Sequence, residues 1–270
     1  GKDSTVLLDL ARQVCPDIPA VYVDTGLEYP ELRDFVKTKD NVIWLLPRYP
    51  YTQILEKYGY PVISKDISDV ISGARKGQPY RLARLNGESL DKNGKKSIYN
   101  CEKYKYLLDA PFAVSARCCY HMKKAPLNKF ERQSGRHPIT GVLACESKLR
   151  EQSYLKFGCN GYERRRPLSQ PLAFWREEDI LLYLKMTGIP YAPIYGDIVE
   201  VKKRNGALTL KTTGVSRSGC MYCMYGVHLE HEPNRFQLME KTHPQQYHYC
   251  IHELELGAVL DYIGVPYSCR

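Results

Sequence analysis

The chain has 270 residues, 43% of them hydrophobic and 26% charged, so it is long enough to bury a core and too apolar to be intrinsically disordered. Its apolar runs are too short for a membrane-spanning helix, and no segment resembles a secretory signal. The formal net charge is +9, which suits polyanionic partners such as nucleotides and nucleic acids. We therefore expect a soluble, cytoplasmic protein without a membrane partner.

The first half of the chain alternates helical and strand patterns. Ser4–Val14 has apolar residues at helical spacing, and Pro19–Asp24 is a short β-branched run. The alternation continues with a helical pattern at Tyr29–Lys39 and an apolar run at Asn41–Leu46. A third strand is expected at His137–Cys145, followed by a helix. The alternation predicts an α/β fold with an open, mainly parallel sheet that helices cover on both faces.

The last third of the chain has a different pattern. Trp175–Thr187 predicts an amphipathic helix that ends at Gly188. Asp197–Thr213 predicts two strands around the turn signal Arg204-Asn205-Gly206, and short helices are expected between Asn234 and Ile263. This change predicts a domain boundary near residue 190. The expected parts are a nucleotide-binding domain at residues 1–190 and a cysteine-containing C-terminal region at residues 191–270.

The sequence opens with Gly1-Lys2-Asp3-Ser4, directly before a predicted helix. The backbone N–H groups at such a helix end attract anions, and Lys2 adds positive charge. An ordinary helix cap is the alternative, with Asp3 or Ser4 accepting hydrogen bonds from the first N–H groups. The spacing differs from that of a Walker loop, which disfavours a P-loop NTPase.

The stretch GKDSTVLLDLA at residues 1–11 resembles the second part of the SGGxDS loop of the PP-loop ATP pyrophosphatases. Sulfonucleotide reductases and several sulfurtransferases share that fold. The resemblance implies that the opening residues bind nucleotide phosphates. It also implies that a central strand and a Ser-Gly pair precede Gly1.

Two further segments carry the resemblance. Asp24-Thr25-Gly26 and the residues up to Pro30 resemble the DTG-x-x-(F/Y)-P segment of APS and PAPS reductases, although an ordinary βα loop is the alternative. The segment from Thr140 to Arg150 resembles TG-x-R-x-x-(E/Q)-S-x-x-R, with Leu143 at the position of the family arginine, which puts one phosphate or sulfate contact in question. The resemblance implies catalytic roles for Lys2, Asp3 and Asp24. It implies nucleotide binding by Gly1, Lys2, Asp3, Ser4, Asp24, Thr25, Gly26, Gly141, Glu146, Ser147 and Arg150.

Ten cysteines are many for a chain without a secretory signal, so metal binding or redox chemistry is favoured over disulfides. The adjacent Cys118 and Cys119 begin a stretch that resembles CC-x-x-x-K-x-x-P-L of the iron–sulfur sulfonucleotide reductases. A CxxC at Cys220 and Cys223 follows 100 residues later. Thiolates favour iron–sulfur clusters or zinc. The resemblance implies a [4Fe–4S] cluster held by Cys118, Cys119, Cys220 and Cys223.

Other interpretations of the cysteines remain open. The CxxC together with His228 and His231 would form a zinc site, which leaves the tandem cysteines unused. A redox CxxC is a further alternative. In a cluster with three protein ligands and one open iron, a member of the tandem pair, or Cys159, would have another role. Cys15 and Cys145 lie in apolar patterns and are expected in the core.

The resemblance leads to two enzymatic functions. In the first, ATP with Mg²⁺ binds at the opening residues, an acceptor is adenylylated with release of pyrophosphate, and sulfur then displaces AMP. Sulfurtransferases of this type include tRNA thiolases and the DNA phosphorothioation enzyme, so tRNA, DNA and a small metabolite are all candidate acceptors. A cysteine desulfurase is a candidate sulfur donor, and an oligomer is compatible with this function.

In the second function, a cysteine thiolate attacks the sulfur of APS or PAPS, and thioredoxin then releases sulfite. The intact Lys2-Asp3-Ser4 is typical of the ATP users. The Glu-Cys-Gly-Leu-His stretch that carries the reductase nucleophile has no counterpart in this sequence, and Cys250 and Cys269 lack its surroundings. We therefore favour the ATP-dependent sulfurtransferase over the reductase. A non-catalytic nucleotide or nucleic-acid binding module is the third alternative.

Overall fold

The computed structural model describes residues 1–269, which form two compact units, each built from two separate segments of the chain. Unit 1 contains Gly1–Leu46 and Pro126–Gly219, and unit 2 contains Pro47–Ala125 and the chain from Cys220 onward. All the candidate nucleotide-binding residues belong to unit 1, and the four candidate cluster cysteines belong to unit 2. The boundary predicted near residue 190 falls within unit 1 and stays a prediction.

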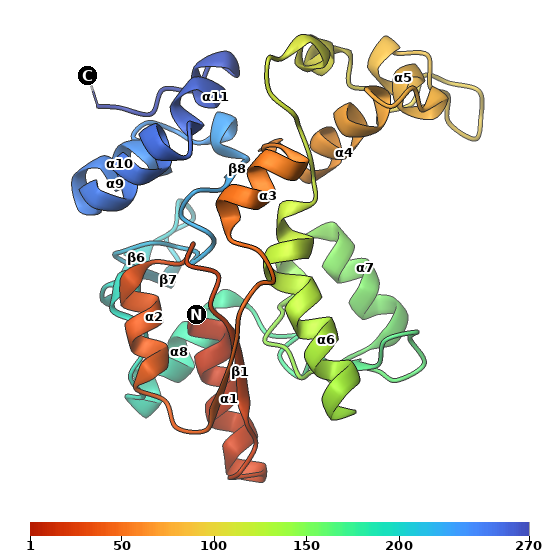
Figure 1. Ribbon diagram of the computed structural model, residues 1–270. Helices are drawn as coiled ribbons and strands as arrows, with labels where there is room; N and C mark the ends of the chain where they lie inside the picture. The colour runs from red at the N-terminus through yellow and green to blue at the C-terminus, as the bar shows by residue number, and fades with distance from the viewer. Residues whose placement is uncertain (270) are drawn as a thin grey trace. The chain divides into compact units, whose positions relative to one another are not determined.

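Unit 1 begins with the alternation that the sequence predicts (Figure 1). Helix α1 (Lys2–Val14) precedes strand β1 (Ala20–Val23), and helix α2 (Pro30–Lys37) precedes strand β2 (Val42–Leu45). The two strands pair in parallel, from Ala20 opposite Val42 to Val23 opposite Leu45. The predicted α/β class with parallel strands is therefore confirmed.

The core of unit 1 lies between α1 and α8 (Glu177–Thr187). α8 ends at Gly188, whose φ of 65° is in the left-handed region that glycine adopts without strain, as predicted. The strands β6 (Ile198–Lys202) and β7 (Leu208–Thr212) form the predicted antiparallel hairpin, and Ile198 and Leu210 pack against the core. The fully or nearly fully buried residues of this core are Val6, Leu7, Leu143, Leu172, Ile180, Leu181 and Leu184.

The prediction of a strand at His137–Cys145 is wrong. Only Ile139 forms an isolated parallel bridge, with Ser169, and the chain then enters a 3₁₀ turn, η3 (Ala144–Glu146). Gly141 packs against α1 and Leu143 enters the core, whereas Ile139 is 43% exposed, so the segment contributes Leu143 to the core without extending the sheet. The remaining elements of this region are α6 (Ala125–Ser134), α7 (Lys148–Phe157), β4 (Asn160–Gly161), β5 (Leu168–Ser169) and η4 (Pro193–Tyr195).

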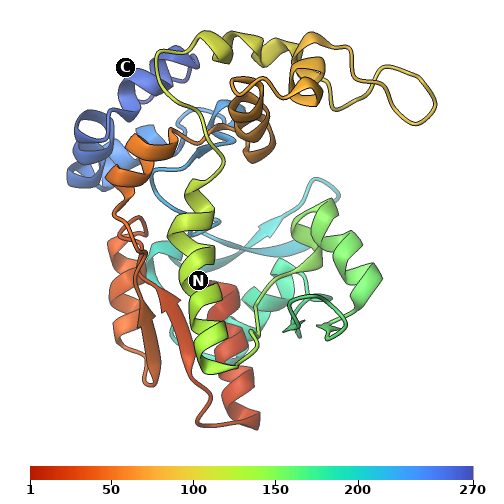
Figure 2. The ribbon, with the colours of Figure 1, turned by 45° about the vertical axis from the view of Figure 1, so that its right-hand side comes forward.

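Unit 2 is mainly helical, and its two chain segments meet in a short parallel pairing of β3 (Val62–Ile63) with β8 (Met224–Tyr225). Its long loop between α5 and η1 extends outward from the helices (Figure 2). The short helices predicted between Asn234 and Ile263 are confirmed. The helices of the unit are α3 (Tyr51–Tyr58), α4 (Lys65–Ala74), α5 (Pro79–Asn86), η1 (Glu102–Asp109), η2 (Tyr120–Lys124), η5 (Val227–Leu229), α9 (Arg235–Thr242), α10 (Pro244–His248), η6 (Tyr249–Glu253) and α11 (Leu256–Tyr262). Within residues 1–269, no helix combines the length and apolar character needed to cross a bilayer.

Candidate functional site

The amino end of α1 is the first part of the candidate site. Gly1 occupies the N-cap position, and no side chain of the described residues caps the helix. The alternative in which Asp3 or Ser4 serves as a side-chain cap is therefore not realised. The first-turn N–H groups of a helix have no partner within the helix, so this end can bind an anion through its backbone.

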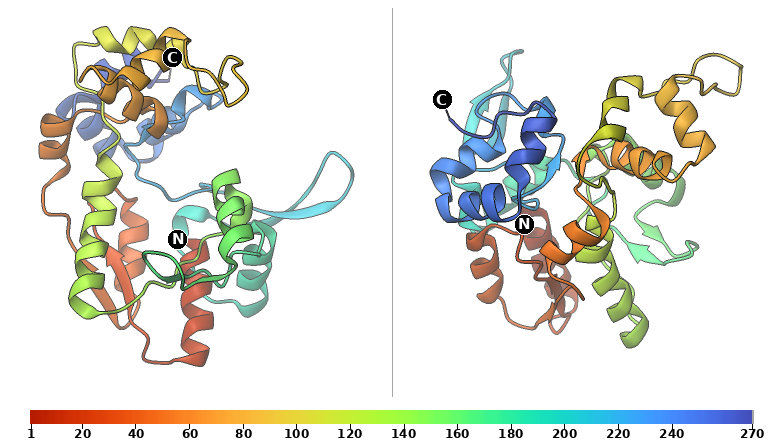
Figure 3. Two further views of the ribbon diagram at one scale, coloured as in Figure 1. Left: turned by 90° about the vertical axis from the view of Figure 1, so that its right-hand side faces the viewer. Right: turned by 45° about the horizontal axis from the view of Figure 1, so that its top comes forward.

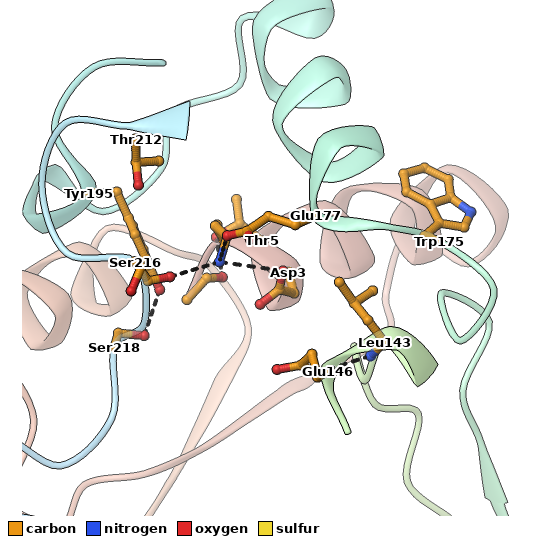
Figure 4. Close-up of polar contacts among 12 residues, drawn as sticks. Asp3, Thr5, Leu143, Glu146, Trp175, Glu177, Tyr195, Thr212, Ser216 and Ser218 are labelled. Atoms are coloured by element: carbon orange, nitrogen blue, oxygen red, sulfur yellow. Dashed lines mark hydrogen bonds and ion pairs between the residues drawn. The ribbon is translucent and has the colours of Figure 1, made fainter. Parts of the chain in front are cut away.

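Lys2 lies in the first turn of α1 with only 5% of its surface exposed. Its Nζ is 3.1 Å from Glu177 Oε1 and donates a 3.1 Å hydrogen bond to the carbonyl oxygen of Ser216. It also lies 5.5 Å from the centre of the Tyr195 ring. Asp3, Glu177 and Ser216, whose oxygens lie within 4.0 Å of this ammonium group, are close to one another in Figure 4. The cation is thus held among residues that come from distant parts of unit 1.

Asp3 has a carboxylate oxygen without a hydrogen bond. Oδ1 is buried and has no hydrogen-bond partner among the described residues, and Lys2 Nζ is 4.0 Å away. Gly141 packs against the same turn, because a Cβ at this position would be 3.0 Å from the Asp3 carbonyl oxygen and 3.3 Å from the Ser4 nitrogen. The structure therefore brings together the two predicted segments that contain Asp3 and Gly141.

The loop after β1 is held by its own side chains. Arg33 Nε and Nη2 donate to Asp24 Oδ2 at 2.9 and 2.8 Å, and Asp24 is 8% exposed. Thr25 Oγ1 is 2.7 Å from Glu28 Oε2, and Gly26 has a φ of 71°, which favours glycine. Asp24, Thr25 and Gly26 thus form a preformed turn at the carboxyl end of β1. Arg33 was not predicted, since no sequence motif marks it as the partner of Asp24.

The segment from Leu143 to Arg150 is joined by local contacts. Glu146 forms an ion pair with Arg150 and accepts a 3.3 Å hydrogen bond from the Leu143 nitrogen. Ser147 caps α7, because its Oγ accepts from the Arg150 nitrogen at 3.3 Å. Leu143 is 2% exposed and belongs to the core. The position of the family arginine is therefore apolar and buried, and it offers no contact to a phosphate or sulfate.

The four predicted ligand cysteines lie within electrostatic range of one another in unit 2. A hydrogen bond to Cys119, burial and the charges of Cys119, Cys220 and Cys223 all raise the pKa of Cys118. The hydrogen bond from Cys118, followed by the charges of Lys123 and two other lysines, lowers the pKa of Cys119 to about 6. We call Cys118, Cys119, Cys220 and Cys223 the thiol set.

Two tyrosines lie beside the thiol set. Burial, followed by the charges of Cys118, Cys223 and Cys220, raises the pKa of Tyr51. Burial also raises the pKa of Tyr225, with contributions from Cys119, Cys223 and Cys118. Within residues 1–269 the buried Tyr225 hydroxyl has no hydrogen-bond partner of normal geometry, although Ser68 lies near enough to oppose the rise in its pKa. The Ser68 hydroxyl itself donates to the Val62 carbonyl oxygen at 2.7 Å. An unpaired donor therefore lies next to the thiols.

The zinc alternative would need Cys220, Cys223, His228 and His231 to meet around one ion. Within residues 1–269, no three His, Cys, Asp or Glu side chains are close enough together to hold one metal ion. His228 lies edge-on to Tyr104, with 6.4 Å between ring centres, and burial followed by the charge of Lys103 lowers its pKa. Its neighbours are therefore different from those of the thiol set. Cys159 belongs to unit 1.

The expectation that Cys15 and Cys145 are core residues is wrong. Both are exposed, whereas Cys101 and Cys250 are buried. Cys15 comes directly after the last residue of α1, and Cys145 lies in the η3 turn with its Sγ 3.7 Å from the Trp175 carbonyl oxygen. Apolar neighbours in the sequence therefore did not indicate burial at either position.

Comparison with known proteins adds an independent observation. The family model of the phosphoadenosine phosphosulfate reductase domain matches residues 1–43 and 94–224, which is more than half of the chain. The chain belongs to this family. The residues of this chain that the phosphoadenosine phosphosulfate reductase domain model matches include every candidate nucleotide-binding residue and the whole thiol set.

Curated relatives agree with the family. Adenosine 5′-phosphosulfate reductases from two strains of Staphylococcus epidermidis are each 26% identical over 202 residues, which cover 72% of this chain and 62% of the relative. An uncharacterized protein of Methanocaldococcus jannaschii is 38% identical over 65 residues, or 23% of this chain and 16% of that protein. The chain thus spans about three-fifths of the length of the curated reductases it matches.

Proposed function

We propose that the chain is an ATP-dependent sulfurtransferase that adenylylates an acceptor, releases pyrophosphate and then replaces AMP with sulfur. The observation that carries the proposal is Asp3 Oδ1, which is buried without a hydrogen bond beside the Lys2 ammonium group. A buried polar atom without a partner is costly unless a ligand satisfies it. Mg²⁺ prefers carboxylate and phosphate oxygens, so ATP with Mg²⁺ fits this end of α1.

Each residue at this end has a separate role in the proposal. The first-turn N–H groups of α1 bind phosphate oxygens, and Asp3 ligates the Mg²⁺ that accompanies ATP. Lys2 exchanges Glu177 for a phosphate oxygen and stabilises the charge that develops on the departing pyrophosphate. Gly141 keeps the neighbouring segment close to α1 without a side chain in the way. Asp24, held by Arg33, orients the turn at the end of β1.

The thiol set fits an iron–sulfur cluster better than a single zinc ion. The charges of Cys119, Cys220 and Cys223 all act on Cys118, so the four thiols are neighbours, and thiolates are the usual ligands of such a cluster. A zinc site formed by the CxxC with His228 and His231 would leave Cys118 and Cys119 unused. The buried Tyr225 hydroxyl is suited to donate to a sulfide or thiolate. A [4Fe–4S] cluster held there would supply the sulfur-binding chemistry, with a protein such as a cysteine desulfurase as sulfur donor.

A sulfonucleotide reductase is the second candidate, favoured by the similarity to adenosine 5′-phosphosulfate reductase. In that reaction a cysteine thiolate attacks the sulfur of APS or PAPS and forms a thiosulfonate; AMP or its 3′-phosphate form leaves, and thioredoxin releases sulfite. Cys250 is fully buried and burial raises its pKa to about 12, which makes it a poor nucleophile. The Cys269 thiol is 3.6 Å from the Gln237 carbonyl oxygen. The burial of Cys250 therefore favours the ATP-dependent function over a reductase that uses this thiol as its nucleophile.

Nucleotide titration calorimetry tests the proposal. We expect ATP with Mg²⁺ to bind the wild-type chain at least tenfold more tightly than APS or PAPS. Asp3→Asn removes one Mg²⁺ ligand and should weaken ATP binding by about tenfold, or about 1.4 kcal/mol. Asp17→Asn, which neutralises an exposed carboxylate just beyond the other end of α1, is the matched control and should bind ATP normally.

Activity measurements then separate the candidate functions. Release of pyrophosphate that depends on an acceptor and is lost in Asp3→Asn supports the sulfurtransferase. Tighter binding of APS or PAPS, with sulfite formed in the presence of thioredoxin, would replace the proposal with the reductase. ATP binding without pyrophosphate release in the presence of tRNA, DNA or metabolite acceptors would indicate a non-catalytic nucleotide-binding module.

A further inference from the structure

A basic groove lies in unit 1 between the start of α8 and the β6–β7 hairpin. Its volume is about 520 Å³, and it is lined by Arg176 and Glu177 at the start of α8 and by Lys202 and Lys211 of the hairpin. Val201 and Leu210 contribute apolar surface between these charges. We call this feature the hairpin groove.

The carboxylates of the hairpin groove already have partners. Glu178 Oε1 is 2.5 Å from both Lys203 Nζ and Thr209 Oγ1. Glu177 Oε1 is 3.1 Å from Lys2 Nζ. Two of the negative charges that line the groove are therefore neutralised by neighbouring lysines, and the groove retains an excess of positive charge.

The remaining cations have no such partner. Arg176, Lys202 and Lys211 are exposed, and within residues 1–269 none of them forms an ion pair with a carboxylate, although the charge of Arg176 contributes to the lowered pKa of Glu178. Lysines elsewhere in the unit differ, since Lys37 pairs with Asp34 at 2.7 Å. Three unpaired cations in one groove leave a local positive potential that attracts a polyanion.

The shape of the hairpin suits an extended ligand. The hairpin projects from the rest of unit 1 as a two-stranded ribbon, at the right of the left-hand view in Figure 3. Each five-residue strand spans about 17 Å. The charges of a nucleic-acid strand repeat about every 3.4 Å along a duplex axis, so an extended backbone can reach cations that lie apart on the hairpin and at the start of α8 through different phosphates. A single small anion would leave most of these cations unused.

We propose that the hairpin groove binds the sugar–phosphate backbone of a nucleic-acid acceptor. This inference rests on the proposed function, because it names the acceptor class of the same enzyme. Glu177 lines the groove and also contacts Lys2 at the amino end of α1. A backbone in the groove would therefore be one side chain away from the residues proposed to bind the phosphates of ATP.

Fluorescence anisotropy tests the inference with labelled single-stranded DNA, single-stranded RNA and duplex DNA over a range of salt concentrations. The hairpin variant K202Q/K211Q should lose at least tenfold in affinity. Its salt dependence should also fall, by about 1.4 in the slope of log K against log[salt] for single strands, or about 0.7 for each lost phosphate contact. The preferred oligonucleotide identifies the acceptor as DNA or RNA.

The matched control is K37Q/K129Q, which removes the same charge from exposed lysines of α2 and α6 and should retain wild-type affinity. Equal affinity of the two double variants would overturn the inference. Displacement of the oligonucleotide by inorganic pyrophosphate at equal phosphate concentration would also overturn it, because it would indicate a site for small anions. Circular dichroism establishes that the variants are folded.

Failure of this inference differs from failure of the proposed function. If the inference about the hairpin groove is wrong, K202Q/K211Q binds the oligonucleotide as tightly as the wild type does, while ATP binding still depends on Asp3. If the proposed function is wrong, Asp3→Asn leaves ATP binding unchanged, whatever the oligonucleotides do. Calorimetry with ATP on K202Q/K211Q should give the wild-type affinity, since neither lysine contacts the opening residues of α1.

Discussion

The candidate sites of the two units differ in the state of their side chains before a ligand binds. In unit 1 two charged side chains of the candidate site are already paired, Lys2 with Glu177 and Asp24 with Arg33, whereas Asp3 Oδ1 has no hydrogen-bond partner within residues 1–269. In unit 2 the thiol set lies among buried tyrosine hydroxyls, and burial raises the pKa of Cys223. A ligand of unit 1 must therefore replace existing ion pairs, whereas a metal in unit 2 must displace protons from thiols. Salt should weaken the first kind of binding, and low pH should weaken the second.

The turn at the end of β1 and the thiol set also differ in how far apart in sequence their residues lie. Thr25 and Gly26 are positioned by the strand and turn in which they occur. The thiol set instead needs two distant segments to meet. Cys223 directly precedes β8, and β8 pairs with β3. The site in unit 2 therefore forms only when this non-local pairing forms.

Cysteine replacement in unit 2 should give the largest effect. Cys223→Ser removes one ligand of the thiol set, so we expect iron and acid-labile sulfide after anaerobic reconstitution to fall to near zero, with loss of the visible absorbance. Cys15→Ser, at an exposed position in unit 1, is the control and should retain both. Equal iron content in the two variants would show that Cys223 is not a metal ligand. The comparison between an ion-pair site in unit 1 and a metal site in unit 2 would then be wrong.

Core truncation in unit 1 should have the next largest effect. Leu143→Ala leaves a cavity among the core residues packed on α1 and should lower the free energy of unfolding by about 3 kcal/mol. Leu149→Ala, with 78% of Leu149 exposed, should change it little. Urea unfolding measures both. Iron content should stay the same in both variants, and a loss of iron in Leu143→Ala would show that the units do not hold their sites independently.

The sequence allowed the local parts of both sites to be predicted. Helical spacing predicts α1, a β-branched run predicts β1, and the Asn-Gly turn predicts the hairpin. The partners of Lys2 were not predictable, because Glu177 and Ser216 lie more than 170 residues away and no spacing rule connects them. They follow from how α1 packs in the unit, which only the structure shows.

Two failures have a common physical reason. His137–Cys145 has the apolar composition of a buried strand, yet it forms one isolated bridge, and of its residues Leu143 enters the core while Ile139 stays exposed. Cys15 and Cys145 have apolar neighbours but face outward. Local composition indicates that a segment is near the core, whereas the direction of each side chain depends on tertiary packing. The thiol set was found from a family resemblance, since spacing alone left zinc and redox alternatives open.

Replacement of Tyr225 in unit 2 should have a smaller effect, on the reduction potential of a reconstituted cluster. Tyr225→Phe removes the buried hydroxyl beside the thiol set, and a lost hydrogen bond to a sulfide should lower the reduction potential of a reconstituted cluster by about 20–60 mV. Tyr222→Phe is the matched control, because Tyr222 lies in the same CxxC but faces Cys250 and Tyr249. Equal potentials in the two variants, measured by redox titration, would show that Tyr225 makes no contact with the cluster.

The smallest effect tests whether ion pairs matter in unit 2 as they do in unit 1. Arg84 is 4% exposed and donates to Asp66 at 2.6 and 3.1 Å, and this hydrogen bonding lowers the pKa of Asp66. A carboxyl with a lowered folded-state pKa contributes stability above its unfolded pKa of about 3.9, and this contribution is lost as the pH falls through the folded value.

Asp66→Asn should therefore destabilise the chain by about 1 kcal/mol at neutral pH, a value reduced for solvent screening because the Asp66 side chain is 59% exposed. The difference from the wild type should shrink below about pH 4. Asp34→Asn breaks an exposed pair with Lys37 in unit 1 and should have a smaller effect at neutral pH. Urea unfolding across the pH range measures both variants. If the free energy of unfolding of Asp66→Asn stays below that of the wild type by the same amount down to low pH, lost packing and not lost charge causes the difference.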